Sequence, residues 1–457
     1  MSPDDTIAAI ATPLGEGGLA VVRLSGADAL TLADRVFRPS GRSPQAPSQA
    51  ASHTLHHGWV TGRGRVVDEV LLAVMRAPRT YTREHVVEIS CHGGLLVAKL
   101  VLESVLEQGA RLALPGEFTK RAFLNGRLDL AQAEAVADLI HARTELALTA
   151  ANEQLAGKLS QRINRLRDDL LDILAHVEAH IDFPEEDIAP DTAGQICGRL
   201  QEAVTFMEGL LRTSREGQLL RRGIRAAIIG RPNVGKSSLL NQLLGHDRAI
   251  VSPIPGTTRD TIEETANIRG LPVVFVDTAG LREAEDTLEE EGVRRSQAAR
   301  ARAELILHVL DASEPLTPAD EQCLREHASR AHILVCNKCD LARKLTLPAA
   351  ASVPTVEVSC VTGQGIESLK DAIRGAVWSG ETKAEMLEVM ISARHQEALR
   401  RAREAAQRTR EALAAGQSFE LAALDLRIAV NAVGEVVGKT TTEDLLDSIF
   451  SQFCIGK

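Results

Sequence analysis

The pattern of hydrophobic and polar positions alternates between two periods along the first 120 residues. A period of two is typical of strands, and a period near 3.6 is typical of helices. Because short segments of both kinds follow one another, this part of the chain is predicted to be an α+β domain. The expected strands cover residues 7–10, 20–24, 69–75 and 85–90, and the expected helices cover residues 28–37 and 95–107.

Long helices are predicted on both sides of the middle of the chain. Apolar residues recur at steps of three and four from Leu155 to Val177, which predicts one long amphipathic helix that ends before Pro184. A further helical tract is expected up to about Gly217, and helices return from about Thr382 to the C-terminus. In this last block four residues are expected to share one helix face: Leu426, Val430, Val433 and Val437.

The C-terminal end is predicted to be a packed helix rather than a frayed tail. Residues 443–450 have amphipathic spacing, and their apolar side chains would pack against the helical blocks. This packing would bring Cys454 and Lys457 to one fixed place. The apolar positions are Leu446, Ile449, Phe450 and Phe453.

Between the two helical blocks the pattern changes to short apolar runs, which are typical of buried parallel strands. The run at residues 224–229 precedes a glycine-rich turn and a helical segment at residues 238–244. We therefore expect a multidomain α/β protein in which an α/β domain is inserted into a helical domain and an α+β domain precedes both. The predicted segments are residues 1–120, 121–216, 217–379 and 380–457.

Composition fits a chain of several packed domains. The 457 residues exceed what one hydrophobic core usually holds, and 44% of them are hydrophobic and 25% charged. No apolar run approaches the ~20 residues that cross a bilayer. Seven scattered cysteines suit a reducing compartment, and residues 1–5 lack the features of a secretion signal. We expect a cytoplasmic protein without a membrane partner.

The net charge of −10 means that a nucleic acid would have to meet a local basic face. One basic tract lies in the second helical block. It is either a solvated helix face interleaved with glutamates or an RNA contact. Its members are Arg400, Arg401, Arg403, Arg408 and Arg410.

The strongest chemical signal is the segment from Gly230 to Ser237, which fits the phosphate-loop pattern G-x-x-x-x-G-K-[ST]. Its glycines let backbone N–H groups and a helix N-terminus face the phosphates. Lys236 adds a positive charge, and the Ser237 hydroxyl can bind Mg²⁺. A strand before the loop and a helix after it supply the context that the motif requires.

Further motifs point to GTP. Asp277 ends a predicted strand, where it can hold Mg²⁺ through water, and Gly280 can donate its N–H to the γ-phosphate. Asn337-Lys338-Cys339-Asp340 fits N-K-x-D, whose aspartate can accept two hydrogen bonds from guanine that adenine does not offer. An ATPase therefore leaves this motif unexplained. The expected GTP-binding residues are Asn233, Val234, Gly235, Lys236, Ser237, Ser238, Ser252, Pro253, Ile254, Pro255, Gly256, Thr257, Thr258, Asp277, Thr278, Ala279, Gly280, Asn337, Lys338, Asp340, Ser359 and Cys360.

The position that often carries a water-orienting glutamine, directly after Asp277–Gly280, holds Leu281. Leucine can neither orient nor polarise water, so hydrolysis needs another group. Acidic candidates follow at Glu283, Glu285, Asp286, Glu289, Glu290 and Glu291.

Taken together, these motifs resemble the MnmE/TrmE family, the tRNA uridine-5-carboxymethylaminomethyl modification GTPases. The likeness extends over essentially the whole chain. It rests on the GTPase motifs and on residues 6–13, 22–26, 92–94, 115–126, 128–134 and 453–457.

The resemblance implies an N-terminal domain similar to aminomethyltransferases that binds 5-formyltetrahydrofolate, or another tetrahydrofolate one-carbon carrier, and that dimerises. The matching folate positions are Arg23, Glu88, Arg127 and Lys457. It also implies a potassium ion beside the phosphates, a water-orienting Glu289 and a functional Cys454. The implied metal ligands are Ser237 and Thr258 for Mg²⁺, and Asn233, Ser252, Ile254 and Thr257 for K⁺.

We therefore expect a cytoplasmic, homodimeric, potassium-dependent GTP hydrolase. Such a protein would act with an FAD-dependent partner of the MnmG/GidA family, in a heterotetramer, to form a carboxymethylaminomethyl or aminomethyl group at C5 of the wobble uridine of certain tRNAs. The alternative is an RNA-binding, ribosome-assembly GTPase of the Era/EngA type, although neither a K-homology domain nor a second GTPase copy is evident. A GTP-dependent structural switch on membranes has no anchor to support it.

Overall fold

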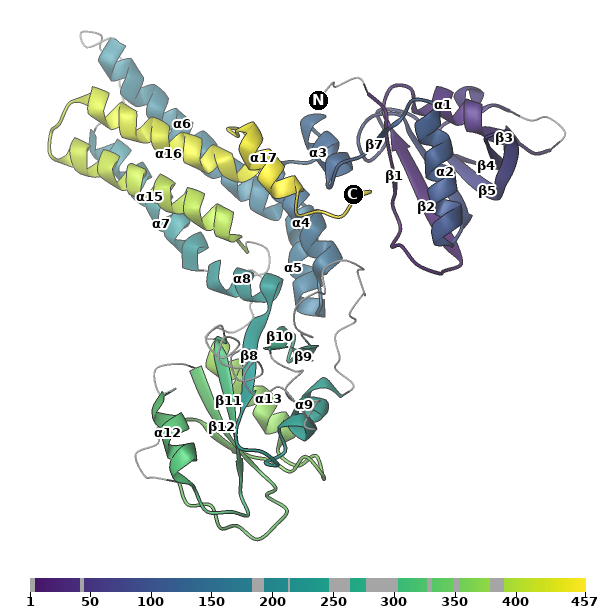
Figure 1. Ribbon diagram of the computed structural model, residues 1–457. Helices are drawn as coiled ribbons and strands as arrows, with labels where there is room; N and C mark the ends of the chain where they lie inside the picture. The colour runs from purple at the N-terminus through teal and green to yellow at the C-terminus, as the bar shows by residue number, and fades with distance from the viewer. Residues whose placement is uncertain are drawn as a thin grey trace. The chain divides into compact units, whose positions relative to one another are not determined.

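The structure is a computed structural model that describes residues 5–41, 45–182, 193–212, 214–245, 264–276, 303–326, 331–347, 353–378 and 390–457 (Figure 1). The chain divides into two compact units. The first unit comprises Met1–Ala137, Ser160–Leu171 and Val430–Lys457, and the second comprises Asp138–Leu159 and Asp172–Ala429. Each unit contains one sheet, and each is described by itself below.

The first unit is built on a seven-stranded sheet with the order β3-β4-β5-β6-β2-β1-β7. All neighbouring strands are antiparallel except β1 and β7, which are parallel. The strands are β1 (Ile7–Ile10), β2 (Leu19–Ser25), β3 (Phe37–Pro39), β4 (Thr54–Gly62), β5 (Arg65–Met75), β6 (Val86–His92) and β7 (Arg111–Leu112).

Alternating side chains of this sheet enter two different cores, as the two-residue period requires. Ala8 packs with α1 (Ala29–Val36) and α2 (Leu95–Glu107), which cover one face. Its neighbours Ile7 and Ala9 point the other way and pack with Phe118 of α3 (Glu117–Leu124). The face that carries α3 therefore differs from the face that forms the main core. A short 3₁₀ helix, η1 (Pro47–Gln49), lies beside α1.

The second unit is built on a six-stranded sheet with the order β13-β12-β11-β8-β10-β9. Its strands are parallel except β9, which runs antiparallel to β10. In such a sheet ligands bind at the carboxyl ends of the strands, beside the point where the order changes direction. The strands are β8 (Ile224–Ile229), β9 (Glu264–Ile268), β10 (Leu271–Val276), β11 (Leu305–Asp311), β12 (Ala331–Asn337) and β13 (Thr355–Glu357).

Helices cover both faces of this sheet. On one face α9 (Lys236–Leu244) and α13 (Ile366–Val377) share a core with Leu305, Leu307 and Val309 of β11. On the other face α12 (Pro318–Glu326) contributes Cys323 and Leu324, which pack against residues of β8, β11 and β12. The described part of this segment thus has helices on both faces of a mostly parallel sheet, which agrees with the predicted α/β class.

The main core of this sheet also contains residues of the helical segments around it. Ala147 and Ala150 of α5 (Glu145–Leu155) and Leu219 and Leu220 of α8 (Ser214–Arg222) belong to the same hydrophobic cluster as β8 and α9. α8 leads into β8 through Gly223, whose φ is 74° and whose missing side chain leaves room for Pro272 O. The sheet and these helices are therefore packed together directly.

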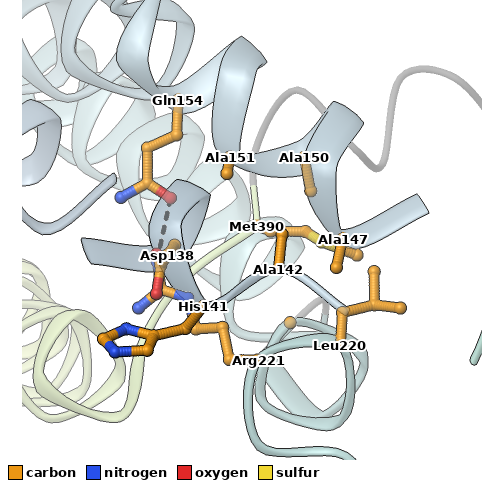
Figure 2. Close-up of a pocket in the computed structure, with 11 residues that line it drawn as sticks. Asp138, His141, Ala142, Ala147, Ala150, Ala151, Gln154, Leu220, Arg221 and Met390 are labelled. Atoms are coloured by element: carbon orange, nitrogen blue, oxygen red, sulfur yellow. Dashed lines mark hydrogen bonds and ion pairs between the residues drawn. The ribbon is translucent and has the colours of Figure 1, made fainter. Parts of the chain in front are cut away.

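A crevice of about 30 Å³ remains where α5, α8 and Met390 meet, enough for about one water molecule (Figure 2). Four of the eleven residues that line it are alanines. On one side Arg221 lies 2.7 Å from Asp138 and donates to Gln154 Oε1 at 2.9 Å. This crevice is too small for an organic ligand, and its polar groups hold α8 against α5.

The remaining helices form long arms. In the second unit α7 (Ala193–Arg212) and α15 (Ala393–Ala414) lie side by side (Figure 1). Ser392 and His395 form a capping box that starts α15. The other helices are α4 (Leu130–His141), α6 (Lys158–Asp182), α16 (Phe419–Val437) and α17 (Glu443–Phe450).

The helical predictions are largely confirmed, with two corrections at helix ends. The apolar stripe predicted from Leu155 does not belong to one helix, because α5 ends at Leu155 and α6 begins at Lys158, after Gly157 with φ 85°. The tract expected to end near Gly217 continues to Arg222. The predicted face of α16 and the apolar positions of the C-terminal helix are buried.

Candidate functional site

The phosphate loop connects β8 to α9 and owes its path to backbone conformations that glycine favours. Gly230 and Gly235 have φ values of 147° and 97°, and Asn233 also has a positive φ of 64°. A Cβ on Gly230 would lie 2.4 Å from Val309 O, and one on Gly235 would lie 2.2 Å from Asn337 Nδ2. Any side chain at these two positions would push the loop away from its neighbours.

Lys236 begins α9, and its ammonium donates hydrogen bonds to Gly230 O at 3.0 Å and Arg231 O at 2.7 Å. These two hydrogen bonds hold the Lys236 ammonium against the phosphate loop. Ser237 is exposed in the first turn of the same helix, which suits a hydroxyl ligand for Mg²⁺. Asn233 is also exposed and could offer its amide oxygen to a cation.

Asn337 joins three segments that are far apart in the sequence. Its Nδ2 donates to Val234 O at 2.8 Å, and its Oδ1 accepts from the Cys360 N–H at 3.2 Å. The side chain is 2% exposed. The phosphate loop, the N-K-x-D segment and the Ser359–Cys360 segment are therefore held together by one amide, as the predicted GTP site requires.

Lys338 and Asp340 follow Asn337 at the carboxyl end of β12. Lys338 has a φ of 65°, an uncommon conformation for a residue with a side chain. Its ammonium lies 2.5 Å from Asp311 Oδ2. Asp340 is exposed, so its carboxylate can reach a ligand. Asp311 belongs to none of the motifs described above. Its one sequence signal is that an aspartate ends the apolar run 305–311.

The Ser359–Cys360 segment forms a tight turn after β13. Ser359 is fully buried, and its hydroxyl accepts from the Thr362 N–H at 3.3 Å. Gly365, with φ 78°, allows the chain to pass close to Glu357 O. Gln242 of α9 donates to Cys360 O at 2.8 Å. These contacts fix the segment beside Asn337.

The cysteines near this site do not form a metal centre in the part of the chain that the structure describes, where no group of three or more potential ligands is found. Burial raises the pKa of the Cys360 thiol to about 11 and also raises the pKa of Cys336 and Cys339. Protonated thiols of this kind are poor nucleophiles and poor metal ligands.

Several predicted site residues lie outside the described residues, including most of the expected K⁺ ligands and the expected water-orienting group. They are Ser252, Pro253, Ile254, Pro255, Gly256, Thr257, Thr258, Asp277, Thr278, Ala279, Gly280, Glu289 and the other acidic candidates between residues 283 and 291.

A second cluster lies in the first unit and contains the four predicted folate residues. Arg23 of β2 faces Glu88 of β6 across the sheet, with Arg23 Nε 2.7 Å from Glu88 Oε1. Arg23 also donates to Gly456 O at 3.1 Å. Burial lowers the pKa of the Lys457 ammonium, the positive charge of Arg23 lowers it further, and the negative charge of Glu88 opposes both. The structure thus brings Arg23, Glu88 and Lys457 together.

Arg127 reaches the same cluster through aromatic rings. Its guanidinium lies 4.9 Å from the centre of the Tyr81 ring, and Arg23 lies 5.7 Å from the centre of the Phe118 ring. Tyr81 Oη is 3.0 Å from Thr119 Oγ1. Burial raises the pKa of Tyr81, although the charges of Arg127 and Arg23 oppose this shift. Tyr81 is a member of this cluster that the sequence analysis did not identify.

The C-terminal tail is anchored here by main-chain hydrogen bonds. The N–H groups of Gly116 and Phe118, at the start of α3, donate to Cys454 O at 3.4 Å and Lys457 O at 3.2 Å. Carbonyl groups of the tail thereby satisfy donors that a helix start leaves open. The Cys454 side chain is exposed. The side chains of the cluster combine two guanidinium groups and one ammonium with one carboxylate, an excess of positive side-chain charge that suits an acidic ligand.

The basic tract of the second helical block is paired with acidic residues. Arg400 contacts Glu397 at 2.6 Å, Arg403 contacts Glu404 at 3.6 Å and Arg408 contacts Asp425 at 2.7 Å. This agrees with a solvated face interleaved with acids. None of the helices in the described part of the chain is long and apolar enough to cross a membrane.

The chain matches known proteins over nearly its whole length. The family described as GTP-binding protein TrmE N-terminus matches residues 6–127, and the family described as MnmE helical domain matches residues 130–454. Proteins named tRNA modification GTPase MnmE are 50% identical in Chloroflexus aurantiacus, over 99% of this chain and 100% of the relative, and 48% identical in Geobacillus kaustophilus, over 100% of both. A third, from Geotalea uraniireducens, is 47% identical over 100% of both. With its phosphate loop, N-K-x-D segment and helical arms in place, the chain belongs to the MnmE family of tRNA modification GTPases.

Proposed function

We propose that this chain hydrolyses GTP and that this activity serves the modification of tRNA. The observation that carries the nucleotide part is the pair of hydrogen bonds made by the Asn337 side chain. They join it to Val234 O of the phosphate loop at 2.8 Å and to the N–H of Cys360 in the Ser359–Cys360 segment at 3.2 Å. This arrangement supports one ligand site at the carboxyl edge of the sheet, shared by Asp340 and the phosphate loop. The names of the relatives support the tRNA part.

In this proposal each predicted site residue has a definite task. The loop N–H groups and Lys236 bind the phosphates, and Asp340 selects guanine over adenine. Ser237, together with Thr258, would hold Mg²⁺, which offsets charge on the phosphates. Asn233, with Ser252, Ile254 and Thr257, would hold K⁺, whose charge can do the work of an arginine finger. Glu289 would orient the attacking water in place of the glutamine replaced by Leu281.

We further propose that the cationic cluster of the first unit binds a tetrahydrofolate one-carbon carrier, in a fold similar to aminomethyltransferases. Arg23, Arg127 and Lys457 suit the carboxylates of such a ligand, and Glu88 can accept a hydrogen bond from its ring. The one-carbon unit would be used at C5 of the wobble uridine. The proposal includes a homodimer that works in the cytoplasm with an FAD-dependent partner of the MnmG/GidA family. It also includes four domain segments, with boundaries at residues 120, 216 and 379.

The GTPase part is tested with purified protein in buffers that differ only in the alkali cation. We expect the hydrolysis rate to fall steeply when K⁺ is replaced by Na⁺, by roughly the 10³–10⁵ that a finger arginine contributes elsewhere. Asn233→Ala should remove the difference, whereas Asn431→Ala, an exposed asparagine far along the chain in α16, should keep it. A wild-type rate that does not depend on the cation contradicts the potassium site.

The tRNA part is tested by mass spectrometry of nucleosides in tRNA from cells that lack this protein. We expect loss of the modified wobble uridine and its return when the wild-type gene is restored. Normal tRNA nucleosides combined with a ribosome-assembly defect would favour the Era/EngA-type alternative instead.

A further inference from the structure

Asp311 is a nearly buried carboxylate at the edge of the nucleotide site. It ends β11, is 4% exposed, and its Oδ2 lies 2.5 Å from the Lys338 ammonium. Its other oxygen, Oδ1, accepts hydrogen bonds from the Ser313 N–H at 2.9 Å and the Ser313 hydroxyl at 2.6 Å. Both carboxylate oxygens are therefore engaged, and the group has one fixed orientation.

The sheet register fixes this carboxylate relative to the N-K-x-D segment. Asp311 is paired with Asn337 in the parallel ladder of β11 and β12, and the Ala312 N–H donates to Asn337 O at 2.8 Å. Lys338 is the next residue after Asn337. The Asp311 carboxylate thus contacts the lysine from a neighbouring strand whose position is set by backbone hydrogen bonds.

Lys338 needs such a contact for two reasons. Its φ of 65° is a conformation that side-chain-bearing residues adopt only when their surroundings hold them there. Its long side chain is also 34% exposed, and a lysine side chain that is free to rotate loses rotamer entropy whenever a ligand fixes it. An ion pair made in advance lowers that cost.

We propose that Asp311 is a positioning residue for the guanine nucleotide, which acts by holding Lys338 in the conformation that lines the base site. Asp311 does not contact the nucleotide itself. The Lys338 ammonium neutralises the negative charge of the Asp311 carboxylate, so this carboxylate adds no net negative charge near the phosphates. This inference rests on the proposed GTP site and adds to it a residue outside every motif described above.

The test is a double-mutant cycle between Asp311→Asn and Lys338→Met, read out as the dissociation rate of fluorescent mant-GDP in stopped-flow measurements. Asp311→Asn should speed dissociation by about tenfold, the size expected for one hydrogen bond to a charged group. Lys338→Met should do the same or more. The double variant should be no faster than Lys338→Met alone, because Asp311 acts only through Lys338. Discrimination between GTP and xanthosine triphosphate should stay unchanged, since Asp340 is intact.

Asp371→Asn is the matched control, because Asp371 forms an ion pair with Arg269 at 2.7 Å in the same unit but outside the nucleotide site. It should leave mant-GDP dissociation unchanged. Ser313→Ala is a milder variant that removes one support of Asp311 and should raise the rate by a smaller factor, which keeps the test available if Asp311→Asn unfolds.

Three results would overturn the inference: a wild-type rate in Asp311→Asn, slower dissociation in Asp311→Asn, or multiplicative effects in the double variant. A wild-type protein that binds no guanine nucleotide would instead show that the proposed GTP site is wrong, which is a different outcome.

Discussion

Asp340 illustrates how much chemistry one exposed carboxylate can carry when the residues before it are fixed. Asn337 is buried and bonded on both sides, and Lys338 is held by Asp311, so the direction in which the chain leaves β12 is set. The Leu341 N–H donates to Lys338 O at 3.0 Å and closes the turn that presents Asp340. The carboxylate that we propose to select guanine is thus positioned by its neighbours.

We expect Asp340→Asn to weaken GTP binding and to improve binding of xanthosine triphosphate. A carboxylate accepts two hydrogen bonds from guanine, whereas an amide offers one donor and one acceptor, which suits the xanthine ring. The loss of a bidentate charged contact should cost GTP about 2–3 kcal/mol, or roughly 30–150-fold in affinity. Titration of the variant and the wild type with both nucleotides measures the two affinities. Unchanged GTP affinity in the variant would show that Asp340 does not bind the base.

A sequence alone can predict such residues where a motif fixes both the residue type and its spacing. The phosphate loop and N-K-x-D are of this kind, because their geometry depends on neighbours in the sequence. Asp311 and Tyr81 were missed because each acts across a sheet or against a helix, on Lys338 and on Arg127 and Thr119. Nothing in the local sequence distinguishes them from an ordinary strand end or an ordinary core aromatic residue.

The helix α3 shows how a network of buried charges holds a short element in place. Glu117, in its first turn, is 3% exposed and accepts hydrogen bonds from Arg111 Nη2 at 2.5 Å, Arg121 Nη2 at 3.2 Å and the Leu114 N–H at 2.8 Å. Asp5, just before β1, pairs with the same two arginines. This network ties the start of α3 to β1 and β7.

We expect Glu117→Gln to loosen α3 and to destabilise the first unit by about 2–3 kcal/mol, at the low end of the cost of breaking a buried pair because Arg111 is partly exposed. Hydrogen–deuterium exchange of residues 111–124 should speed up accordingly. Glu367→Gln, in an exposed ion pair with Arg269, should leave this segment unchanged. Equal protection in the Glu117 variant and the wild type would show that α3 does not depend on the network.

The same network predicts acid sensitivity. Burial raises the pKa of Glu117 and Asp5, but the hydrogen bonds and charges of the two arginines outweigh it, and both pKa values lie below the ordinary 4.5 and 3.8. The ionised forms therefore stabilise the fold above these ordinary values, and the stabilisation is lost as the pH falls below them. Protection of α3 should decrease below about pH 4 in the wild type and change less in Glu117→Gln.

The tail beyond α17 is expected to serve the first unit alone. Deleting residues 454–457 removes the carbonyl groups that accept from Gly116, Phe118 and Arg23. Loss of a helix cap costs about 1 kcal/mol, so the chain should still fold. Binding of 5-formyltetrahydrofolate should be weakened and wobble-uridine modification should be lost, while GTP hydrolysis stays near the wild-type rate. Cys454→Ser should impair only modification. Normal modification in cells that carry only the deletion would contradict the folate-site proposal.

Elements were predicted best where the periodicity was strong and their partners were near in sequence. The strand 224–229 and the helix 95–107 agree with β8 and α2 residue by residue. The role of α5 was missed because an alanine-rich helix has little apolar contrast, although Ala147 and Ala150 lie in the core of the second sheet. The break at Gly157 was missed because Leu155, which ends α5, has the same spacing of three to four residues as the apolar positions of α6.

Across the whole chain, the two units are interleaved rather than consecutive. The first unit begins at the N-terminus, returns at Ser160–Leu171 and is completed by Val430–Lys457. The sequence analysis predicted a different division, with one α/β domain at residues 217–379 between two helical blocks, and that division stays a prediction. The family resemblance placed Lys457 with Arg23 and Glu88, but no local pattern indicated that carbonyl groups of the tail accept hydrogen bonds from the start of α3.

This interleaving has a consequence for how the protein is made. About 260 residues separate Leu171 from Val430, and at about 5–20 residues per second a ribosome needs roughly 10–50 s to synthesise them. Throughout that time the nascent N-terminal sheet lacks α17 and the carbonyl groups that cap α3, although Phe118 and its neighbours have already left the ribosome. A chain that stops before α17 lacks the carbonyl groups that accept hydrogen bonds from Gly116 and Phe118, so the start of α3 stays without this cap.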